Sequence, residues 1–317
     1  MREHDLGGGR SNRRRRFDDD EPRYLKRRRP EAQSPRSATN QLLPVAVENP
    51  DDGPPTGDRW STFTDTGTLH GPQPWPEWVV TDDGGIDTEL GLLKTGKEAD
   101  VFLIERSGPN SGRSVLMAAK RYRSSEHRMF HRDAGYLEGR RERESRVNRA
   151  AGKRTSFGRE VIAGQWAGAE FAALGRLWQI GAEHGGVRVP YPVQLVGSEL
   201  LLEFIGSPDG EAAPRLVQTR PSWEELRSLW SQLVDALTVL ARMGLAHGDL
   251  SPYNVLVHEG QLVLIDLPQV VDVVINPQGA QFLARDVTVM AKWFAARGLE
   301  HDPSPLVDDL LRDAGVG

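Results

Sequence analysis

The sequence predicts an α+β fold of two lobes, a small lobe rich in β-strands followed by a larger helical lobe. From about residue 85, short apolar runs bounded by turn residues come first, and amphipathic helical patterns come after them. Before that point the chain is rich in Arg, Asp, Pro and Ser and shows no hydrophobic periodicity. We therefore expect one globular domain at 85–317, with the strand-rich lobe at about 85–204 and the helical lobe at about 205–317.

The strand-rich lobe is predicted from three apolar runs. DVFLI at 100–104 and SVLMAAK at 114–120 are joined by a turn-rich connection and have the character of neighbouring strands. ELLLEFIG at 199–206 predicts a further buried strand. Between the second and third runs, WAGAEFAALGRLWQI at 166–180 has the spacing of an amphipathic helix.

The helical lobe begins with the clearest helical pattern of the chain, at 222–243. Ser222 and Glu225 form a capping box, and leucines then recur at i, i+3, i+4 and i+7. The runs NVLV and QLVLID come next and predict a hairpin around a His-Glu-Gly turn. A last helix, at about 280–297, is expected to close the domain.

Charged regions flank and interrupt the predicted core. Residues 1–58 have the composition of a disordered tail, and residues 1–36 alone hold twelve Lys or Arg and seven Asp or Glu. Residues 59–84, with tryptophans among prolines and glycines, are interpreted as a lead-in segment that packs on the domain without regular structure. Residues 120–160 carry thirteen basic and six acidic side chains. Such blocks are typical of solvated segments, and the alternative is contact with a polyanion such as RNA or a ribosomal particle.

Composition excludes several classes of protein. The 317 residues include no cysteine, which excludes disulfides, thiolate metal sites and a cysteine nucleophile. No run approaches the roughly 18 apolar residues of a membrane-spanning helix. The N-terminus carries charges but no apolar core of a secretory signal. These features predict a cytoplasmic protein with no membrane partner.

Three oxygen-bearing side chains are expected to gather at one end of the predicted hairpin. Asp249 and Asn254 lie in LAHGDLSPYNVLV, between the long helix and a strand, and Asp266 ends the next strand. Each alone is typical of a turn or a strand cap. Together they suit Mg²⁺, which prefers one or two carboxylates with phosphate oxygens. In phosphoryl transfer one Asp accepts the substrate hydroxyl proton, while an Asn and a second Asp hold the metal.

The spacing D-x₄-N-x₁₁-D resembles the catalytic loop and metal-binding Asp of protein-kinase-like enzymes. Two families of that superfamily write His-Gly-Asp as this chain does, the RIO kinases and the aminoglycoside-type phosphotransferases. TGKEADVF at 95–102 decides between them, because it closely resembles the RIO nucleotide-loop signature S-x-G-K-E-A-x-V. IDLPQVV and FLARDV also resemble segments of that family. The chain is thus similar to RIO kinases over about 85–297, closer to the subgroup without a winged helix, which implies a two-lobed protein-kinase-like fold.

The resemblance implies catalytic roles for the residues of the hairpin. Asp249 would orient or deprotonate the acceptor hydroxyl, and Asn254 and Asp266 would bind Mg²⁺ or Mn²⁺. His247 is expected to support the loop as a buried hydrogen-bonding residue rather than to act as the base. Gly248 stands where ordinary protein kinases have an Arg that pairs with a phosphorylated activation loop, so we expect catalytic residues that are assembled without such phosphorylation.

The resemblance also implies the nucleotide contacts. Lys120 would bind the ATP phosphates and would be held by Glu170, with Glu160 as the other candidate partner. The other implied contacts are Gly96, Lys97, Glu98 and Val101 in the nucleotide loop, and the backbones of Glu203 and Ile205 at the hinge between the lobes, with side chains facing away.

The implied activity is that of an ATP-dependent atypical serine/threonine protein kinase that uses Mg²⁺ or Mn²⁺. Its acceptor would be another protein or the chain itself, and ATP hydrolysis with autophosphorylation is also implied. Two other functions stay open. One is a small-molecule phosphotransferase of the aminoglycoside-kinase type, and the other is a nucleotide-binding scaffold in ribosome or RNA assembly.

Overall fold

The computed structural model describes residues 53–123 and 156–316, with side chains in the longest helix described from residue 162 onward. These residues lie within one compact unit, Glu48–Gly317. The tail predicted at 1–58 is therefore almost wholly outside the described residues. Most of the basic stretch at 120–160 is outside them as well.

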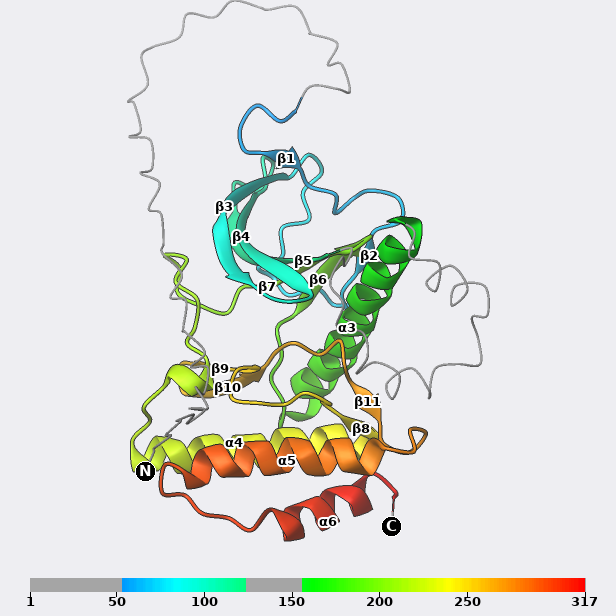
Figure 1. Ribbon diagram of the computed structural model, residues 1–317. Helices are drawn as coiled ribbons and strands as arrows, with labels where there is room; N and C mark the ends of the chain where they lie inside the picture. The colour runs from blue at the N-terminus through cyan, green and yellow to red at the C-terminus, as the bar shows by residue number, and fades with distance from the viewer. Residues whose placement is uncertain (1–52, 124–155, 317) are drawn as a thin grey trace, which may run out of the picture. The chain divides into compact units, whose positions relative to one another are not determined.

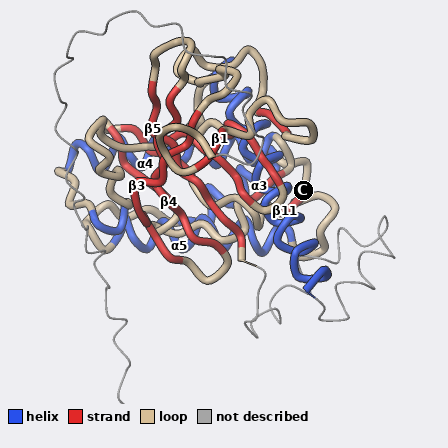
Figure 2. The backbone as a smooth tube through the Cα atoms, turned by 90° about the horizontal axis from the view of Figure 1, so that it is seen from above, coloured by secondary structure: helices blue, strands red, loops and turns tan. Residues whose placement is uncertain are grey.

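The strand-rich lobe is an antiparallel sheet, in which seven strands of the described part of the chain follow the order β1-β3-β4-β5-β7-β6-β2 (Figure 1). The strands are β1 (Arg59–Trp60), β2 (Leu69–His70), β3 (Ile86–Thr95), β4 (Ala99–Ser107), β5 (Ser114–Tyr122), β6 (Pro192–Val196) and β7 (Glu199–Glu203). Figure 2 shows β3 and β4 running side by side when the lobe is seen from above. The strands predicted from the three apolar runs are confirmed as β4, β5 and β7.

The pattern of the sequence did not reveal β3, the strand that leads into the nucleotide-loop motif. Only its first two residues are buried, and Leu90 and Leu92 are exposed. Register shifts near these positions interrupt the alternation of faces that marks a strand in sequence. Alternation of buried and exposed residues is the main sequence signal of a half-buried strand, so β3 could not be recognised from the sequence.

The lead-in segment contributes regular structure, contrary to the expectation. The two-residue strands β1 and β2 pair with β3 and β6 at the two edges of the sheet. Between them the Phe63 ring is buried and packs edge-on against Trp75, with ring centroids 5.1 Å apart. Strands this short leave no periodic pattern, so their formation depends on pairing with the sheet.

A buried polar network joins distant strands of this lobe. Arg106 on β4 is fully buried and donates two hydrogen bonds to Asp87 on β3, at 2.7 and 3.0 Å. Its third nitrogen donates to Gln194 on β6 at 2.8 Å, and Gln194 donates to Thr62 of the lead-in. Each charge therefore has partners with good geometry, which is the condition under which a buried ion pair is tolerated.

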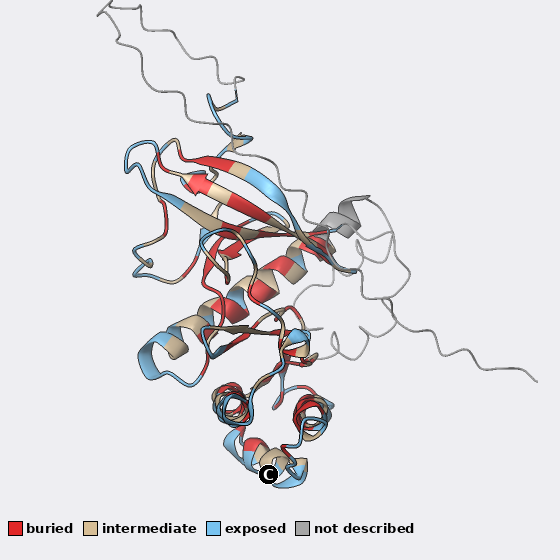
Figure 3. Ribbon diagram, turned by 90° about the vertical axis from the view of Figure 1, so that its left-hand side faces the viewer, coloured by how far each residue is buried: buried red, intermediate tan, exposed pale blue. Residues whose placement is uncertain are grey.

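The helical lobe follows β7. Its helices are α4 (Trp223–Arg242), α5 (Gly279–Ala295) and α6 (Pro303–Asp313), with a short 3₁₀ turn η3 (Leu216–Gln218). The longest helix, α3 (Ser156–His184), lies earlier in the chain, between β5 and β6, and packs against the sheet. The short strands are β8 (Leu245–Ala246), β9 (Val255–His258), β10 (Gln261–Leu264) and β11 (Val271–Asp272). Figure 3 shows that the buried residues concentrate on the sides of the helices and strands that face one another. No helix in the described ranges is long and apolar enough to cross a membrane.

Most sequence expectations for this lobe are confirmed. The capping box is present, with Ser222 accepting from the Glu225 amide and the Glu225 carboxylate accepting from the Ser222 amide. The predicted hairpin is β9–β10. The expectation that the helix at 280–297 closes the domain is wrong, because α6 follows α5 and packs on α4 and α5. Asp302 caps α6 and Pro303 occupies its first turn, a start signal that the sequence reading missed.

We predict that Arg106→Ala lowers the free energy of unfolding by about 3–5 kcal/mol, because the buried Asp87 carboxylate loses both of its short hydrogen bonds and keeps only Arg59, at 3.6 Å. Urea unfolding followed by tryptophan fluorescence measures this. The matched control is Arg312→Ala, which removes an ion pair to Asp309 of 2.6 Å that is largely exposed. An equal loss in both variants would contradict a structural role for the buried network.

Candidate active site

The segment LAHGDLSPYNVLV forms the loop between α4 and β9. Its first residues form β8, which pairs with β11, and its last residues begin β9. His247 is fully buried, and its Nε2 lies 3.1 Å from the carbonyl oxygen of Ile265. This contact ties the loop to the end of β10, so His247 has the buried position expected for a supporting residue.

Gly248 and Asp286 fix the backbone of this loop. Gly248 has a φ of +85°, and a Cβ there would clash with the carbonyl oxygen of Gln269. The Asp286 carboxylate, 1% exposed on α5, accepts from the amides of Gly248 at 2.8 Å and Leu250 at 2.9 Å. Burial raises the pKa of Asp286, and these two hydrogen bonds oppose that rise. The positive φ and the lack of room for a Cβ require glycine at position 248, whatever the regulatory meaning of the missing Arg.

Asp249 lies at the surface of the loop, whereas Asn254 is buried, with 7% of its surface exposed. The Asp249 side chain is 48% exposed, and its Oδ1 lies 3.4 Å from the Arg285 guanidinium. The Asn254 side-chain nitrogen donates to the Asp249 carbonyl at 2.9 Å, which leaves the amide oxygen pointing the other way. The amide of Ile265 donates to the Asn254 carbonyl, so the residue before Asp266 is joined directly to Asn254.

Asp266 follows β10 in a strained backbone conformation, with a φ of +66°. Its Oδ1 accepts from the Lys120 ammonium at 2.6 Å, and its side chain is 41% exposed. Burial by itself raises the pKa of this carboxyl, but the adjacent Lys120 charge outweighs it and lowers the pKa below the usual value. Asp266 is therefore ionised at neutral pH.

Lys120 on β5 lies between two carboxylates. Its Nζ is 2.7 Å from Glu170 Oε2 on α3 and 2.6 Å from Asp266 Oδ1. Burial lowers the pKa of Lys120, but the two negative charges outweigh it and hold the pKa above the usual range. Segments from the sheet, from α3 and from the end of β10 thus meet at one ammonium group.

Glu170 is 1% exposed and has further partners that orient it. Tyr122 donates its hydroxyl to Glu170 Oε2, and the amide of Leu267 donates to Oε1 at 3.2 Å. Burial and the Glu170 charge raise the pKa of Tyr122 well above its usual value, so the hydroxyl remains a donor. Of the two glutamates proposed as partner of Lys120, the structure brings Glu170 to it, while the Glu160 side chain lies outside the described residues.

The residues of the nucleotide-loop motif form a tight turn between β3 and β4. The amide of Gly96 donates to the Ala99 carbonyl at 2.9 Å, and a Cβ at Gly96 would approach that oxygen within 2.9 Å. Lys97 and Glu98 are exposed at the tip of the turn. Val101 lies opposite Lys120 in the β4–β5 pair, on the same face of the sheet.

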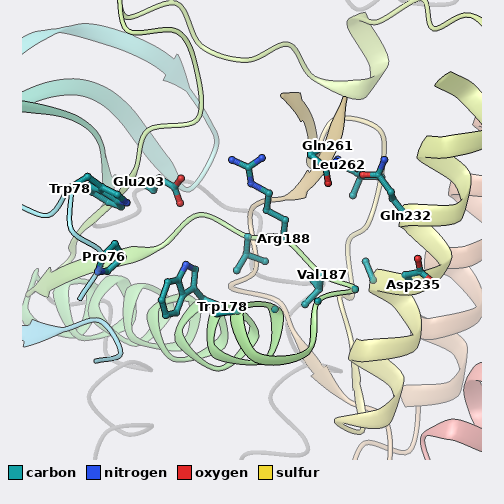
Figure 4. A pocket seen from close by; sticks show the side chains of 16 residues that line it. Pro76, Trp78, Trp178, Val187, Arg188, Glu203, Gln232, Asp235, Gln261 and Leu262 are labelled. Atoms are coloured by element: carbon teal, nitrogen blue, oxygen red, sulfur yellow. Dashed lines mark hydrogen bonds between the residues drawn. The ribbon is translucent and has the colours of Figure 1, made fainter. Parts of the chain in front are cut away.

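The chain passes between the lobes at Glu203 and Ile205. The Ile205 carbonyl accepts from the Ala213 amide at 2.9 Å, which leaves the Ile205 N–H as the group for a further partner. The Glu203 side chain lines a pocket of about 480 Å³ together with Arg188, Trp78 and Trp178, as Figure 4 shows. None of the loop or lysine residues above lines this pocket, so the Glu203 side chain points away from them. Burial raises the pKa of Glu203.

The residues present fit a divalent cation shared with phosphate. The described residues contain no group of three or more His, Cys, Asp or Glu able to hold a metal ion by themselves. Asn254 and Asp266 supply one amide oxygen and one carboxylate, and the carboxylate is accessible. Mg²⁺ is commonly bound through one or two protein oxygens with phosphate oxygens and water. The donor set therefore matches Mg²⁺ bound together with a nucleotide.

Sequence reasoning missed three residues of this site. Asp286 and Arg285 lie in FLARDV, a segment that was matched to a family motif without a role for either side chain. Their contacts to the loop at 248–250 come from α5, more than 30 residues away, so no local pattern reveals them. Tyr122, two residues after Lys120, gave no signal because a tyrosine in a strand is ordinary.

The comparisons with known proteins all give members of one family. The family model described as RIO domain matches residues 110–305. The RIO-type serine/threonine-protein kinase Rio1 of Haloferax volcanii is 35% identical over 239 residues, which cover 75% of this chain and 74% of that protein. Serine/threonine-protein kinase RIO1 of Chaetomium thermophilum is 33% identical over 68% of this chain, and RIO3 of Bos taurus is 28% identical over 70%. The chain spans only 41% of each of these two longer proteins.

We predict that Asp286→Ala loosens the loop, because the amides of Gly248 and Leu250 lose a charged acceptor worth about 1.5–3 kcal/mol for each hydrogen bond. Hydrogen exchange of the amides at 247–254 should accelerate, and the melting temperature should fall. Asp308→Ala, at an exposed position of α6, is the control. Unchanged exchange in Asp286→Ala would show that the loop is held by other contacts.

Proposed function

The chain belongs to the RIO family of atypical serine/threonine kinases, and from that premise we propose that it transfers the terminal phosphoryl group of ATP to a serine or threonine hydroxyl. The carrying observation is the convergence of Lys120, Glu170 and Asp266 beside the loop that bears Asp249 and Asn254. Phosphoryl transfer needs little covalent chemistry from the protein and depends on positioning and charge stabilisation. These are the properties that such a cluster supplies.

We assign the phosphate contact to Lys120. Because Glu170 and Asp266 hold its ammonium charged and in a fixed direction, it can meet a phosphate oxygen without first losing rotational freedom. A lysine swinging in solvent would lose that freedom on binding. Glu170 acts as a positioning residue, because it is buried and its carboxylate is already bound by Lys120, Tyr122 and the Leu267 amide.

We assign the acceptor hydroxyl to Asp249. Its carboxylate is half exposed and lies at the surface of a loop whose backbone is fixed by Asp286. It can therefore receive the proton of a hydroxyl that approaches from solvent. Arg285, 3.4 Å away, is placed to limit the swing of the carboxylate.

Asn254 and Asp266 are the proposed ligands of Mg²⁺ or Mn²⁺. When bound, the cation would neutralise negative charge on the phosphates during transfer. The strained backbone of Asp266 fits this role, because strain is retained mainly where a side chain must point in one direction. The adenine is proposed to bond to the hinge, with the Ile205 N–H and the Glu203 carbonyl as its backbone partners.

The proposed activity does not require phosphorylation of an activation loop. The loop at 247–254 is ordered by Asp286 and by the contact of His247 to Ile265, and neither contact involves a phosphorylatable side chain. Gly248 supplies no cationic receptor for a phosphate. We therefore propose that the catalytic residues are assembled in the unmodified chain.

The acceptor is proposed to be a protein, including the chain itself. The quoted relatives are all named protein kinases, which favours a protein acceptor over the small molecule that the His-Gly-Asp motif alone would also allow. ATP hydrolysis is a side activity of the same site, since water can replace the acceptor hydroxyl. We place the activity in the cytoplasm, in keeping with the absence of cysteine. Binding to RNA or a ribosomal particle through the basic segments stays a prediction, because most of these residues lie outside the described ranges.

We predict that Asp249→Asn lowers the rate of phosphoryl transfer by about 10²- to 10⁴-fold, because the acceptor proton loses its base. Affinity for ATP should stay within about twofold. Transfer is measured with radiolabelled ATP, first with the purified chain alone and then with a cell lysate. Asp308→Asn is the matched control and should transfer at the wild-type rate.

The distribution of label separates the alternatives. Label on protein, lost in Asp249→Asn, supports the kinase. Label on a small molecule would identify a phosphotransferase instead. An unchanged rate in Asp249→Asn would refute the catalytic role of this residue.

A further inference from the structure

Lys94 is a cation in the sheet lobe that the proposed function does not use. It lies opposite Val101 in the β3–β4 pair, and Val101 lies opposite Lys120 in the β4–β5 pair. Directly opposed residues of antiparallel strands share a face, so Lys94, Val101 and Lys120 form one row across the sheet. With strands about 4.8 Å apart, the backbones of the two lysines are roughly 10 Å apart, within reach of one phosphate chain.

Arg215 approaches the same region from the helical lobe. It lies just before η3, and its backbone forms a bridge with Leu256 of β9. Its guanidinium donates to the Tyr253 carbonyl at 2.7 Å, which places it beside Asn254 in the loop. Arg215, Lys120 and Asp266 are the charged groups close enough to Lys94 to affect its pKa.

These two cations lack anionic partners in the described structure. Neither the Lys94 ammonium nor the Arg215 guanidinium forms an ion pair with a described residue. Neighbouring acids are already used, since Asp100 pairs with Arg123 and Glu89 pairs with Arg121. Asp266, the acid that faces Lys94, is bound to Lys120. Each lobe therefore contributes a positive charge that is not bound in an ion pair with a described carboxylate.

The electrostatics of Lys94 agree with this placement. Partial burial and the charge of Arg215 lower the pKa of Lys94 to about 8, Lys120 adds to this effect, and Asp266 opposes it. Solvent still reaches the side chain and screens these charges, so their influence is moderate. An incoming polyanion would reverse the effect and favour the charged lysine.

We propose that Lys94 and Arg215 form a clamp, one cation from each lobe, on the phosphate chain of the bound nucleoside triphosphate. The proposal deepens the proposed function and rests on nucleotide binding at Lys120. The family signature quoted above has Ser at the position of Lys94, so this clamp is a property of the present chain. By binding one anion from two sides, the pair links nucleotide binding to the approach of the lobes.

The test compares ligands with and without phosphates on the full chain. We expect Lys94→Ser, which installs the residue of the signature, to weaken binding of a non-hydrolysable ATP analogue about tenfold. Binding of adenosine should not change, since it carries no phosphate. Lys94→Arg should restore affinity to within about threefold. Lys292→Ser, at an exposed position of α5, controls for loss of one positive charge. Isothermal titration calorimetry gives these dissociation constants.

Arg215→Lys tests the second half of the clamp while it keeps the charge. The planar guanidinium can serve the Tyr253 carbonyl and a phosphate together, whereas an ammonium is a single point of charge. We expect a loss of affinity for the analogue, and a smaller loss in Lys94→Ser/Arg215→Lys than the product of the single losses.

The pH dependence gives a readout that a merely structural role would not change. Wild-type affinity for the analogue should fall about three- to tenfold between pH 7 and pH 9, because the unliganded Lys94, with a pKa of about 8, is mostly neutral at pH 9 and must take up a proton on binding. Lys94→Arg should lack this fall, because Arg stays charged.

Unchanged affinity of Lys94→Ser for the analogue would overturn the proposal. The proposal would also be overturned if Lys94→Ser changed only the KM for the protein acceptor, because Lys94 would then bind the acceptor and not the nucleotide. An equal loss for adenosine would also overturn it, because the variant would then have disturbed the fold. Failure of the proposed kinase activity would appear instead as unchanged transfer in Asp249→Asn, which these binding measurements do not touch.

Discussion

The structure of the candidate site depends on one buried ammonium group, that of Lys120, held by two carboxylates. Glu170 comes from α3 and Asp266 from the end of β10, so this single charge connects the sheet, the helix and the loop of the helical lobe. A buried ion pair is weak evidence for stability, because desolvation offsets much of the attraction. The cluster is better explained by preorganisation, since it fixes a charge at the place where we propose that phosphate binds. Tyr122 and the Leu267 amide also donate to Glu170, but both are neutral groups. Removal of Lys120 would therefore leave the buried Glu170 carboxylate hydrogen-bonded but without a positive charge beside it.

The catalytic loop shows a second constraint, which concerns backbone rather than charge. Gly248 adopts a left-handed φ and leaves no room for a side chain, and the buried Asp286 binds the amides on both sides of Asp249. The absence of Arg at position 248 was first interpreted as a missing regulatory contact. The geometry adds a steric reason, because the neighbouring carbonyl of Gln269 excludes any larger residue. Constitutive assembly of the site stays a prediction, and the arrangement of Asp286 and His247 supports it.

Sequence alone predicted which charged residues meet at the site better than it predicted the strands and polar contacts that hold them. Lys120, Glu170 and Asp266 were chosen through a family resemblance, and the structure places all three in contact although they are separated by 50 and 146 residues. Spacing by itself could not have paired them, because these contacts are tertiary. β3 escaped detection because bulges and exposed leucines disrupt its alternation, and β1 and β2 are too short to form a pattern. Asp286 and Arg106 escaped because the partners of a buried polar side chain depend on the fold.

A double-mutant cycle on Lys120 and Glu170 tests the central claim most directly. The measured quantity is the rate of phosphoryl transfer for the wild type, Lys120→Met, Glu170→Gln and the double variant. If Glu170 acts only by positioning Lys120, the double variant will be no slower than Lys120→Met, and the coupling energy will be close to the full effect of Glu170→Gln. Independent, additive losses would contradict the account, because Glu170 would then contribute to catalysis without Lys120.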